Sequence, residues 1–137
     1  MNIGFTGSRT AATEQQITWM AETLGDLYVS GAQFHHGDCV GKDSAAHIIA
    51  VEIGYWVVVH PPSIHMARAY CQGNEMREPF PYIERNHHIV DETDALMAVP
   101  DDPEHLRSGT WATVRYARKL GKKMFVFDSY EGRCSKL

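Results

Sequence analysis

Three short segments of the chain combine glycine with hydroxyl, acidic or basic side chains. They are Gly7-Ser8-Arg9, Gly37-Asp38 and Arg107-Ser108-Gly109-Thr110. Glycine lets a loop bring its backbone N–H groups close to a ligand, and a helix N-terminus after such a loop favours an anion. Arginine donates two parallel hydrogen bonds to a phosphate or a carboxylate through its planar guanidinium. The segments therefore predict a site for a phosphate-bearing ligand.

Several common nucleotide and nucleophile motifs are absent from the sequence. No GxGxxG segment is present, so we expect no redox dinucleotide and assign no cofactor. Neither the GxxxxGKS or GxxxxGKT phosphate loop nor a GxSxG nucleophile turn occurs. The expected site therefore differs from those of dinucleotide dehydrogenases, P-loop nucleotidases and α/β hydrolases.

The number and spacing of the cysteines give no reason to expect disulfide bonds or a structural zinc site. Cys39, Cys71 and Cys134 are odd in number and form no CxxC pair, which argues against a disulfide framework and a zinc ribbon. Unpaired cysteines are typical of the reducing cytoplasm, which is the location we expect.

The histidines also predict no metal site. The adjacent residues of His35-His36 point to opposite faces of a strand, and those of His87-His88 do not face each other on a helix. The spacing of His36, Asp38 and Cys39 is not that of a known zinc site.

Alternating strand and helix patterns position these segments. Buried apolar runs predict strands, and apolar residues at helical spacing predict the helices between them. Thr13 and Gln16 form a capping box that predicts the start of the first helix. The expected strands cover 2–6, 32–36, 55–60, 95–99 and 123–127, and the expected helices cover about 13–28, 43–52, 82–93 and 108–121. Residues 63–81 show no clear period, and we expect a short helix and a weak extra strand there.

This order of elements predicts an α/β fold with a Rossmann-like parallel sheet and helices on both faces. We expect a single domain over residues 1–137, with a polar tail from about residue 128. Ligands of such sheets bind at the carboxyl ends of the strands, an edge to which His60 also belongs. Asp38 and Asp43 are expected to cap the second helix or to bind a sugar hydroxyl.

Composition and charge exclude several classes of protein. The chain is 44% hydrophobic and 22% charged, which is typical of a globular domain and not of a disordered one. Its net charge of −4 argues against nucleic acid as a partner. The longest apolar stretches, Tyr55–Val59 and Ala95–Val99, are far shorter than the ~20 residues of a membrane span. No basic region precedes an apolar one at the start, so we expect no secretory signal.

The order and spacing of three segments resemble the SLOG superfamily. The segments are Phe5-Thr6-Gly7-Ser8-Arg9, the run from His36 to Asp43, and Arg107-Ser108-Gly109-Thr110-Trp111. This superfamily includes the cytokinin-activating LOG phosphoribohydrolases, the DNA-processing protein A family and nucleotide-sensing domains of bacterial antiviral systems. The stretch from Tyr82 to Pro100 is similar to the LOG pattern of a helix that leads into a strand ending in proline. The resemblance covers about residues 2–127 and implies a nucleotide-binding domain.

The resemblance also implies roles for single residues. Arg85 matches an arginine of the LOG pattern, and Gly109-Thr110 match its phosphate-binding pair. Where LOG enzymes carry a catalytic glutamate, this sequence has Thr113. Threonine supplies neither the negative charge nor the base that N-glycosidic cleavage needs. We therefore expect the protein to bind a nucleotide or nucleotide-derived signal, such as an ADP-ribose derivative or a cyclic nucleotide. It would act as a sensor or sequestering protein without LOG-type hydrolysis.

Two other functions stay open. One is an enzyme, a nucleoside-monophosphate N-glycosidase whose carboxylate is Glu84 or Asp38 in place of the missing glutamate. The other is DNA binding by analogy with DNA-processing protein A, which the acidic net charge disfavours.

The resemblance also implies a homo-oligomer. LOG-like proteins form dimers, which would place the helix of Arg85 or the fourth helix at the interface. Trp19, Trp111 and Tyr116 are aromatic residues that a small domain would leave exposed for such a contact.

Two of the candidate residues have a second interpretation. Arg85 is either a ligand contact or a solvated surface arginine, and Trp111 is either a core residue or a platform on which a base stacks. No catalytic residue is assigned. The expected ligand-binding residues are Gly7, Ser8, Arg9, Gly37, Asp38, Asp43, His60, Arg85, Asn86, Arg107, Ser108, Gly109, Thr110 and Trp111.

Overall fold

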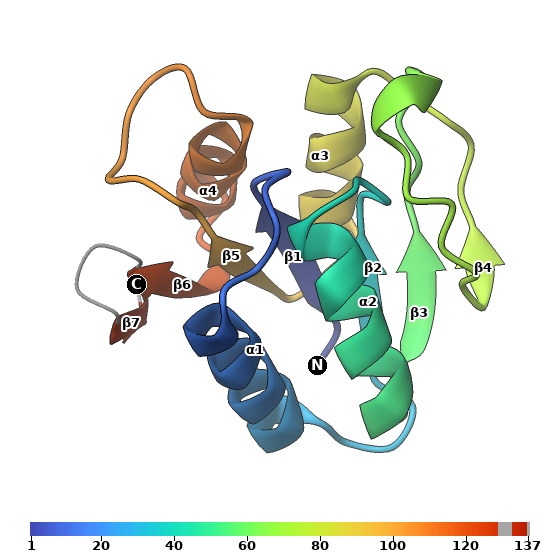
Figure 1. Cartoon of the computed structure of the whole chain (residues 1–137), viewed down its shortest axis with the longest axis vertical. Helices are drawn as coiled ribbons and strands as arrows, with labels where there is room; N and C mark the ends of the chain where they lie inside the picture. Colours follow the sequence, from blue (N-terminus) through green and yellow to red (C-terminus); the bar gives the residue numbers. More distant parts are fainter. Residues whose placement is uncertain (129–132, 137) are drawn as a thin grey trace.

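The computed structural model describes the backbone of residues 1–128 and 133–136 and the side chains of residues 1–127. Over these residues the chain alternates between strands and helices (Figure 1). The strands are β1 (Ile3–Gly7), β2 (Gln33–His36), β3 (Trp56–Val59), β4 (Glu75–Met76), β5 (Ala95–Val99), β6 (Lys123–Asp128) and β7 (Arg133–Lys136). The helices are α1 (Glu14–Leu27), α2 (Lys42–Ile53), α3 (Tyr82–Asp91) and α4 (Gly109–Lys119), with a short 3-10 helix, η1 (His65–Ala67).

The strands form one sheet in the order β4-β3-β2-β1-β5-β6-β7. The ladders from β4 to β6 are parallel, and β7 pairs with β6 in the antiparallel direction. The predicted Rossmann-like parallel sheet with helices on both faces is confirmed. Between β1 and β5 the direction in which strands are added reverses, so the carboxyl ends of these two strands form the topological switch point, where such folds bind ligands.

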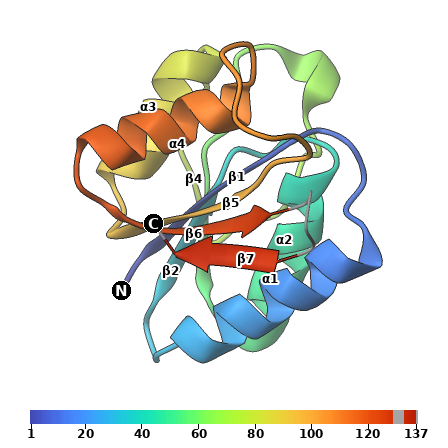
Figure 2. The ribbon, with the colours of Figure 1, turned by 90° about the vertical axis from the view of Figure 1, so that its left-hand side faces the viewer.

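Each face of the sheet is covered by two helices. α1 and α2 lie on one face, and α3 and α4 lie on the other (Figure 2). Alternate residues of β5 divide between the two cores: Met97 packs with the residues of α1 and α2, whereas Leu96 and Ala98 pack beneath α3 and α4. A strand that is buried on both faces explains the continuous apolar run of the sequence there.

Local signals set the helix boundaries. Thr13 caps α1, because its hydroxyl accepts the N–H of Gln16 while the Gln16 side chain accepts the N–H of Thr13, which confirms the predicted capping box. Gly54 ends α2 in the left-handed conformation, with φ of 119°. No described helix combines the length and apolar character that a membrane crossing requires.

The end of the chain differs from the expectation. The sequence predicts β6 as the last strand, followed by a polar tail, but residues 133–136 form β7. A strand at the edge of a sheet is held by backbone hydrogen bonds, and its polar side chains give no apolar pattern to detect. The remaining tail residues, 129–132 and 137, lie outside the described residues.

Candidate functional site

A cavity of about 420 Å³ opens at the carboxyl ends of β1 and β2, beside the switch point. It is bounded by the loops after these strands, by α3 and by the first turn of α4. Its lining consists of Phe5, Thr6, Gly7, Ser8, Arg9, Gly37, Cys39, Asp43, Tyr82, Arg85, Asn86, Ile89, Ser108, Gly109 and Thr110. The three glycine-containing segments of the sequence therefore meet at one place.

The first turn of α4 offers an anion-binding end of the cavity. Ser108 caps the helix, and its Oγ accepts the N–H of Trp111 at 3.1 Å. Gly109 and Thr110 occupy the first two helical positions, whose N–H groups have no partners within a helix. Both residues line the cavity, so the positive end of the α4 dipole faces it.

The loop after β1 forms the opposite wall. Gly7 passes so close to α2 that a Cβ there would lie 2.8 Å from the Cβ of Lys42, which explains the glycine. The Arg9 guanidinium lies over the ring of Tyr82, 4.4 Å from the ring centroid. Arg9 remains exposed, so it can turn toward an anion in the cavity.

An ion pair that the sequence did not indicate, between a buried lysine and a partly exposed aspartate, fixes this loop. Lys42 is fully buried, and its Nζ lies 2.8 Å from Oδ1 of Asp101, in the loop after β5. Nζ also donates to Oγ1 of Thr10 at 2.8 Å, and Ser8 and Thr10 both donate to Asp101. Burial opposes ionisation of Asp101, but the hydrogen bonds from Lys42, Ser8 and Thr10 lower its pKa to about 2. The pair thus joins the loops after β1 and β5.

Arg85 lies buried at the inner end of the cavity, so it is not a solvated surface arginine. Its Nη1 donates to the carbonyls of Gly37 and His60, the latter at 3.0 Å, and its Nε donates to Oδ1 of Asn86 at 2.8 Å. Among residues 1–127, no carboxylate lies within ion-pair distance of the Arg85 or Arg9 guanidinium. Two positive charges therefore border the cavity without a paired anion.

Asp43 is the carboxyl group in the cavity wall. It lies in the first turn of α2 and is 5% exposed, and its Oδ2 accepts the N–H of Cys39 at 3.1 Å. Burial raises the pKa of Asp43 to about 6, although the charge of Arg85 acts in the opposite direction. A carboxyl group with such a pKa can hold or accept a proton near neutral pH.

Four of the expected ligand-binding residues lie outside the cavity lining. Asp38 is buried against Arg68, whose Nε donates to its Oδ2 at 2.7 Å. His60 is buried beside His35, with 2.8 Å between their ring nitrogens, and only its backbone carbonyl serves the site, through Arg85. Arg107 is exposed and is not part of the lining. Loop residues such as Arg107 cannot be placed from a motif, because the conformation of the loop determines where they point.

Trp111 belongs to the core. It packs with the residues beneath α4, and its Nε1 donates to the carbonyl of Asp102 at 2.9 Å. A base-stacking platform is therefore not formed by Trp111, and Tyr82 is the aromatic ring that borders the cavity together with Phe5.

The two carboxylates that the enzyme alternative named are not in the lining either. Glu84 is exposed on α3, and Asp38 is paired as described. Thr113, at the position of the LOG glutamate, is buried and donates to the carbonyl of Gly109 at 2.8 Å. Within residues 1–127, Asp43 is the acidic residue of the lining.

The comparisons with known proteins identify the fold. No protein-family model matches the chain, and no curated protein matches it by sequence. Among solved structures, the molybdenum cofactor binding protein of Rippkaea orientalis matches with a TM-score of 0.72 and 21% identity over 96% of this chain and 78% of that one.

Two further structures have the same fold. DNA processing protein A of Helicobacter pylori has a TM-score of 0.70 and 18% identity over 92% of this chain and 64% of that one. The molybdenum cofactor carrier protein of Chlamydomonas reinhardtii has a TM-score of 0.65 and 19% identity over 91% of this chain and 74% of that one. These structures confirm the Rossmann-like α/β fold that the sequence predicted.

Proposed function

We propose that the cavity binds a nucleotide or another phosphate-bearing, nucleotide-derived ligand, and that the protein serves as a sensor or sequestering protein. The observation that carries this proposal is the meeting of two features at one cavity. One is the first turn of α4 with its unpartnered N–H groups, and the other is the pair of guanidinium groups of Arg9 and Arg85. An anion held between them receives hydrogen bonds from the backbone and charge from the arginines.

The remaining lining suits an organic group. Phe5, Tyr82 and Ile89 supply apolar and aromatic surface, and Asn86 supplies a side-chain amide. The volume of about 420 Å³ lies within the range of about 300–1,000 Å³ that small-molecule sites occupy. A nucleotide, which combines a flat base with a phosphate, matches a cavity that combines aromatic and cationic side chains.

The ligand class is best identified with a panel in a thermal-shift assay. The panel contains AMP, ADP-ribose, cyclic AMP, cyclic GMP and the molybdenum cofactor, which the matched carrier proteins are described as binding. A member that raises the melting temperature is then measured by calorimetry against Arg9→Ala and Arg85→Ala. Each substitution should weaken binding by ~1.5–3 kcal/mol, the cost of a lost charge-assisted hydrogen bond.

The control for this experiment is Arg107→Ala, which removes an exposed arginine outside the cavity lining. The affinity of the Arg107→Ala variant for the ligand should equal that of the unmodified protein. Binding that responds to Arg107→Ala but not to Arg9→Ala would contradict the proposed site. Arg9 is the more decisive of the two cavity arginines, because it is exposed and its loss leaves the core unchanged.

A second candidate function is N-glycosidic cleavage of a nucleoside monophosphate. The observation that favours it is Asp43, a buried carboxyl in the cavity wall with a pKa raised to about 6. Such a group can stabilise a cationic sugar or activate water. Mass spectrometry for released base separates this function from binding alone.

A further inference from the structure

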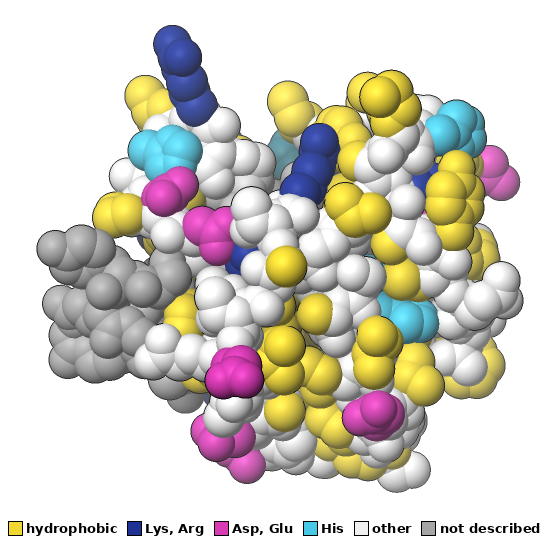
Figure 3. Space-filling model, in the orientation of Figure 1, with side chains coloured by type: hydrophobic (Ala, Val, Ile, Leu, Met, Phe, Trp, Pro, Cys, Tyr) yellow, Lys and Arg dark blue, Asp and Glu magenta, His cyan; other side chains and the backbone are white. Residues whose placement is uncertain are grey.

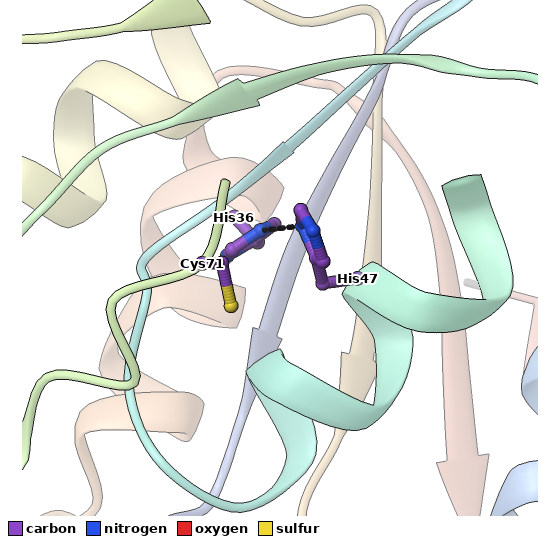
Figure 4. A group of neighbouring side chains, drawn as sticks. All are labelled: His36, His47 and Cys71. Carbon is purple, nitrogen blue, oxygen red and sulfur yellow. Dashed lines mark hydrogen bonds between the residues drawn. The ribbon is translucent and has the colours of Figure 1, made fainter. Parts of the chain in front are cut away.

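Three metal-ligating side chains meet between the sheet and α2, outside the cavity lining. His36 ends β2, His47 lies on α2, and Cys71 lies in the segment between η1 and β4 (Figure 4). The two rings are joined by a hydrogen bond of 2.9 Å between Nε2 of His36 and Nδ1 of His47. One ligand atom of each residue lies within 4.8 Å of the other two.

We propose that His36, His47 and Cys71 bind a single transition-metal ion, and that zinc is the ion this set fits best. Imidazole nitrogen and thiolate sulfur are the donors that zinc prefers, and three protein ligands leave a fourth position open. Two nitrogen ligands of a tetrahedral zinc ion lie about 3.3 Å apart, given Zn–N bonds of about 2.0–2.1 Å. The two nitrogens therefore need to separate by a few tenths of an ångström, and the rings need to turn so that both lone pairs point at the ion.

The surroundings favour a cation. The buried carboxylate of Asp38 accepts the N–H of Cys71 at 2.8 Å through Oδ1, while its Oδ2 is paired with Arg68, so a partly compensated negative charge lies beside the three ligands. Nδ1 of His36 accepts the N–H of Asp38, and the two rings share one hydrogen bond, which fits neutral imidazoles, the form that binds a metal. Cys71 also lines a surface cavity of about 160 Å³, which gives an ion a route from solvent.

Binding requires one proton to leave and one to move. Zinc binds the thiolate, so the metal displaces the thiol proton of Cys71 to solvent. The N–H of Asp38 donates to Nδ1 of His36 at 3.0 Å, so the proton of the neutral ring is on Nε2, where it points at His47. Zinc can bind Nε2 of His36 only if that nitrogen carries no proton, so the proton of the neutral ring must move to Nδ1.

Rotation of the peptide between Gly37 and Asp38 removes this conflict. It would take the Gly37 carbonyl from Nη1 of Arg85 toward Nδ1 of His36, where it would accept the relocated proton. Gly37 has no side chain to resist the change, and Asp38, which now has a φ of 59°, leaves the left-handed region. The same carbonyl accepts a hydrogen bond from Arg85, so the metal site and the ligand cavity share one peptide group.

A second cluster, His35, His60 and Glu92, is less suited to a cation. Glu92 is already paired with Arg77, whose Nη2 lies 2.8 Å from its Oε1. This ion pair competes for the carboxylate ligand of the second cluster, whereas the third ligand of the first cluster is a thiol, a donor that zinc prefers.

Cobalt(II) and zinc titrations of the purified protein test the proposal. Cobalt should produce a thiolate-to-metal charge-transfer band that Cys71→Ser abolishes, and zinc should displace the cobalt at one ion per chain. Zinc affinity should fall about 100-fold or more in Cys71→Ser and His47→Gln, because even losing a hydrogen-bond partner of a ligand costs about 10–100-fold. Calorimetry in two buffers should find about one proton released per zinc ion.

The controls use residues outside the cluster. Cys39→Ser and His105→Gln remove a cysteine and an exposed histidine and should leave zinc affinity unchanged. Cys71→His restores a nitrogen ligand and should recover zinc binding, which separates ligand loss from misfolding. The proposal is overturned if Cys71→Ser binds zinc as tightly as the unmodified protein, or if the cobalt band depends on Cys39. Release of two protons would overturn the peptide rotation, because His36 would then bind as an anion.

Discussion

Arg85 occupies the space that a side chain at position 37 would need. A Cβ on Gly37 would lie 2.5 Å from Nη1 of Arg85, which donates to the Gly37 carbonyl. The glycine of the β2 loop and the arginine of α3 are therefore one structural unit, although 48 residues separate them in the chain.

Gly37→Ala should disturb this unit. We expect a loss of stability of ~1–3 kcal/mol from the forced displacement of Arg85, together with weaker binding of the cavity ligand. Chemical denaturation and calorimetry measure the two effects. Gly109→Ala is the matched control, because a Cβ there meets no atom within 4 Å. Equal stability of the two variants would show that Arg85 is not held as described.

Asp43 should make stability fall as the pH rises. Burial raises its folded pKa from 3.8 to about 6, so between these pH values the folded state binds more protons than the unfolded one. Roughly 2–3 kcal/mol of the free energy of unfolding is lost across this range, at 1.36 kcal/mol per pKa unit. The groups that act on this carboxyl are Arg85, Asp38 and the N–H groups of Gly37 and Cys39.

Denaturation series at pH 4, 5, 6 and 7 measure the effect of Asp43. In Asp43→Asn the part of the slope that Asp43 contributes should vanish. A slope that is identical in the two proteins would mean that Asp43 titrates normally in the folded state.

Asp101 should act in the opposite direction. Its folded pKa of about 2 lies below the ordinary value of 3.8, so its contribution to stability is complete above about pH 5 and is lost as the pH falls toward 2. In Asp101→Asn the melting temperature should fall less between pH 5 and pH 2 than it does in the unmodified protein, as measured by thermal melting over this range. Asp102→Asn changes the exposed neighbouring acid and should leave that fall in melting temperature unchanged.

Release of free base from AMP should be absent or very slow. Thr113 carries no charge to stabilise a cationic sugar, and Glu84 and Asp38 lie outside the cavity lining. Thr113→Glu tests whether a carboxylate at position 113 of α4 is sufficient to give cleavage. Multiple turnovers by the unmodified protein that Asp43→Asn abolishes, and Glu84→Gln does not, would establish the enzyme instead.

The homo-oligomer that the resemblance implies would use the expected α3–α4 layer, but not the two tryptophans that the sequence suggested as contacts. Trp19 and Trp111 are each only 9% exposed, so they are used within the chain. Ile83 on α3 is 74% exposed beside a shallow groove between α3 and α4, and Ile83→Glu should dissociate an oligomer through this layer. Light scattering measures the outcome.

The exposed face of α2 is the alternative oligomer contact. Figure 3 shows hydrophobic side chains exposed over α2 and the segment around η1. Ile48 on α2 is 58% exposed. Dissociation by Ile48→Glu but not by Ile83→Glu would place the contact on the α2 layer and refute the α3–α4 contact. A monomer in the unmodified protein at micromolar concentration would refute the oligomer itself.

Local patterns were enough to predict most of the fold. The capping box at Thr13 and the apolar run of β5 are signals contained in a few adjacent residues, and both correspond to what is observed. The convergence of the glycine-containing segments followed from strand direction, because carboxyl ends of parallel strands share an edge.

Contacts between distant residues could not be read in this way. The pairing of Lys42 with Asp101 joins the start of α2 to the loop after β5, and nothing in either segment marks its partner. The neighbourhood of His36 and His47 likewise depends on how α2 packs on β2. Asp43 was taken as a helix cap or a sugar contact, and its raised pKa follows from burial, which composition does not reveal.

The two ends of the sheet restrict how copies of this chain can join. β4 has only two residues, and β7 reverses the direction of the ladder at the other end. A two-residue edge is too short a template for strand addition, which is the route to domain swapping and amyloid-like stacking. Self-association through continued strand pairing at the β4 edge is thus suppressed by the architecture, and the helical layers are left as the surfaces through which assembly can be regulated.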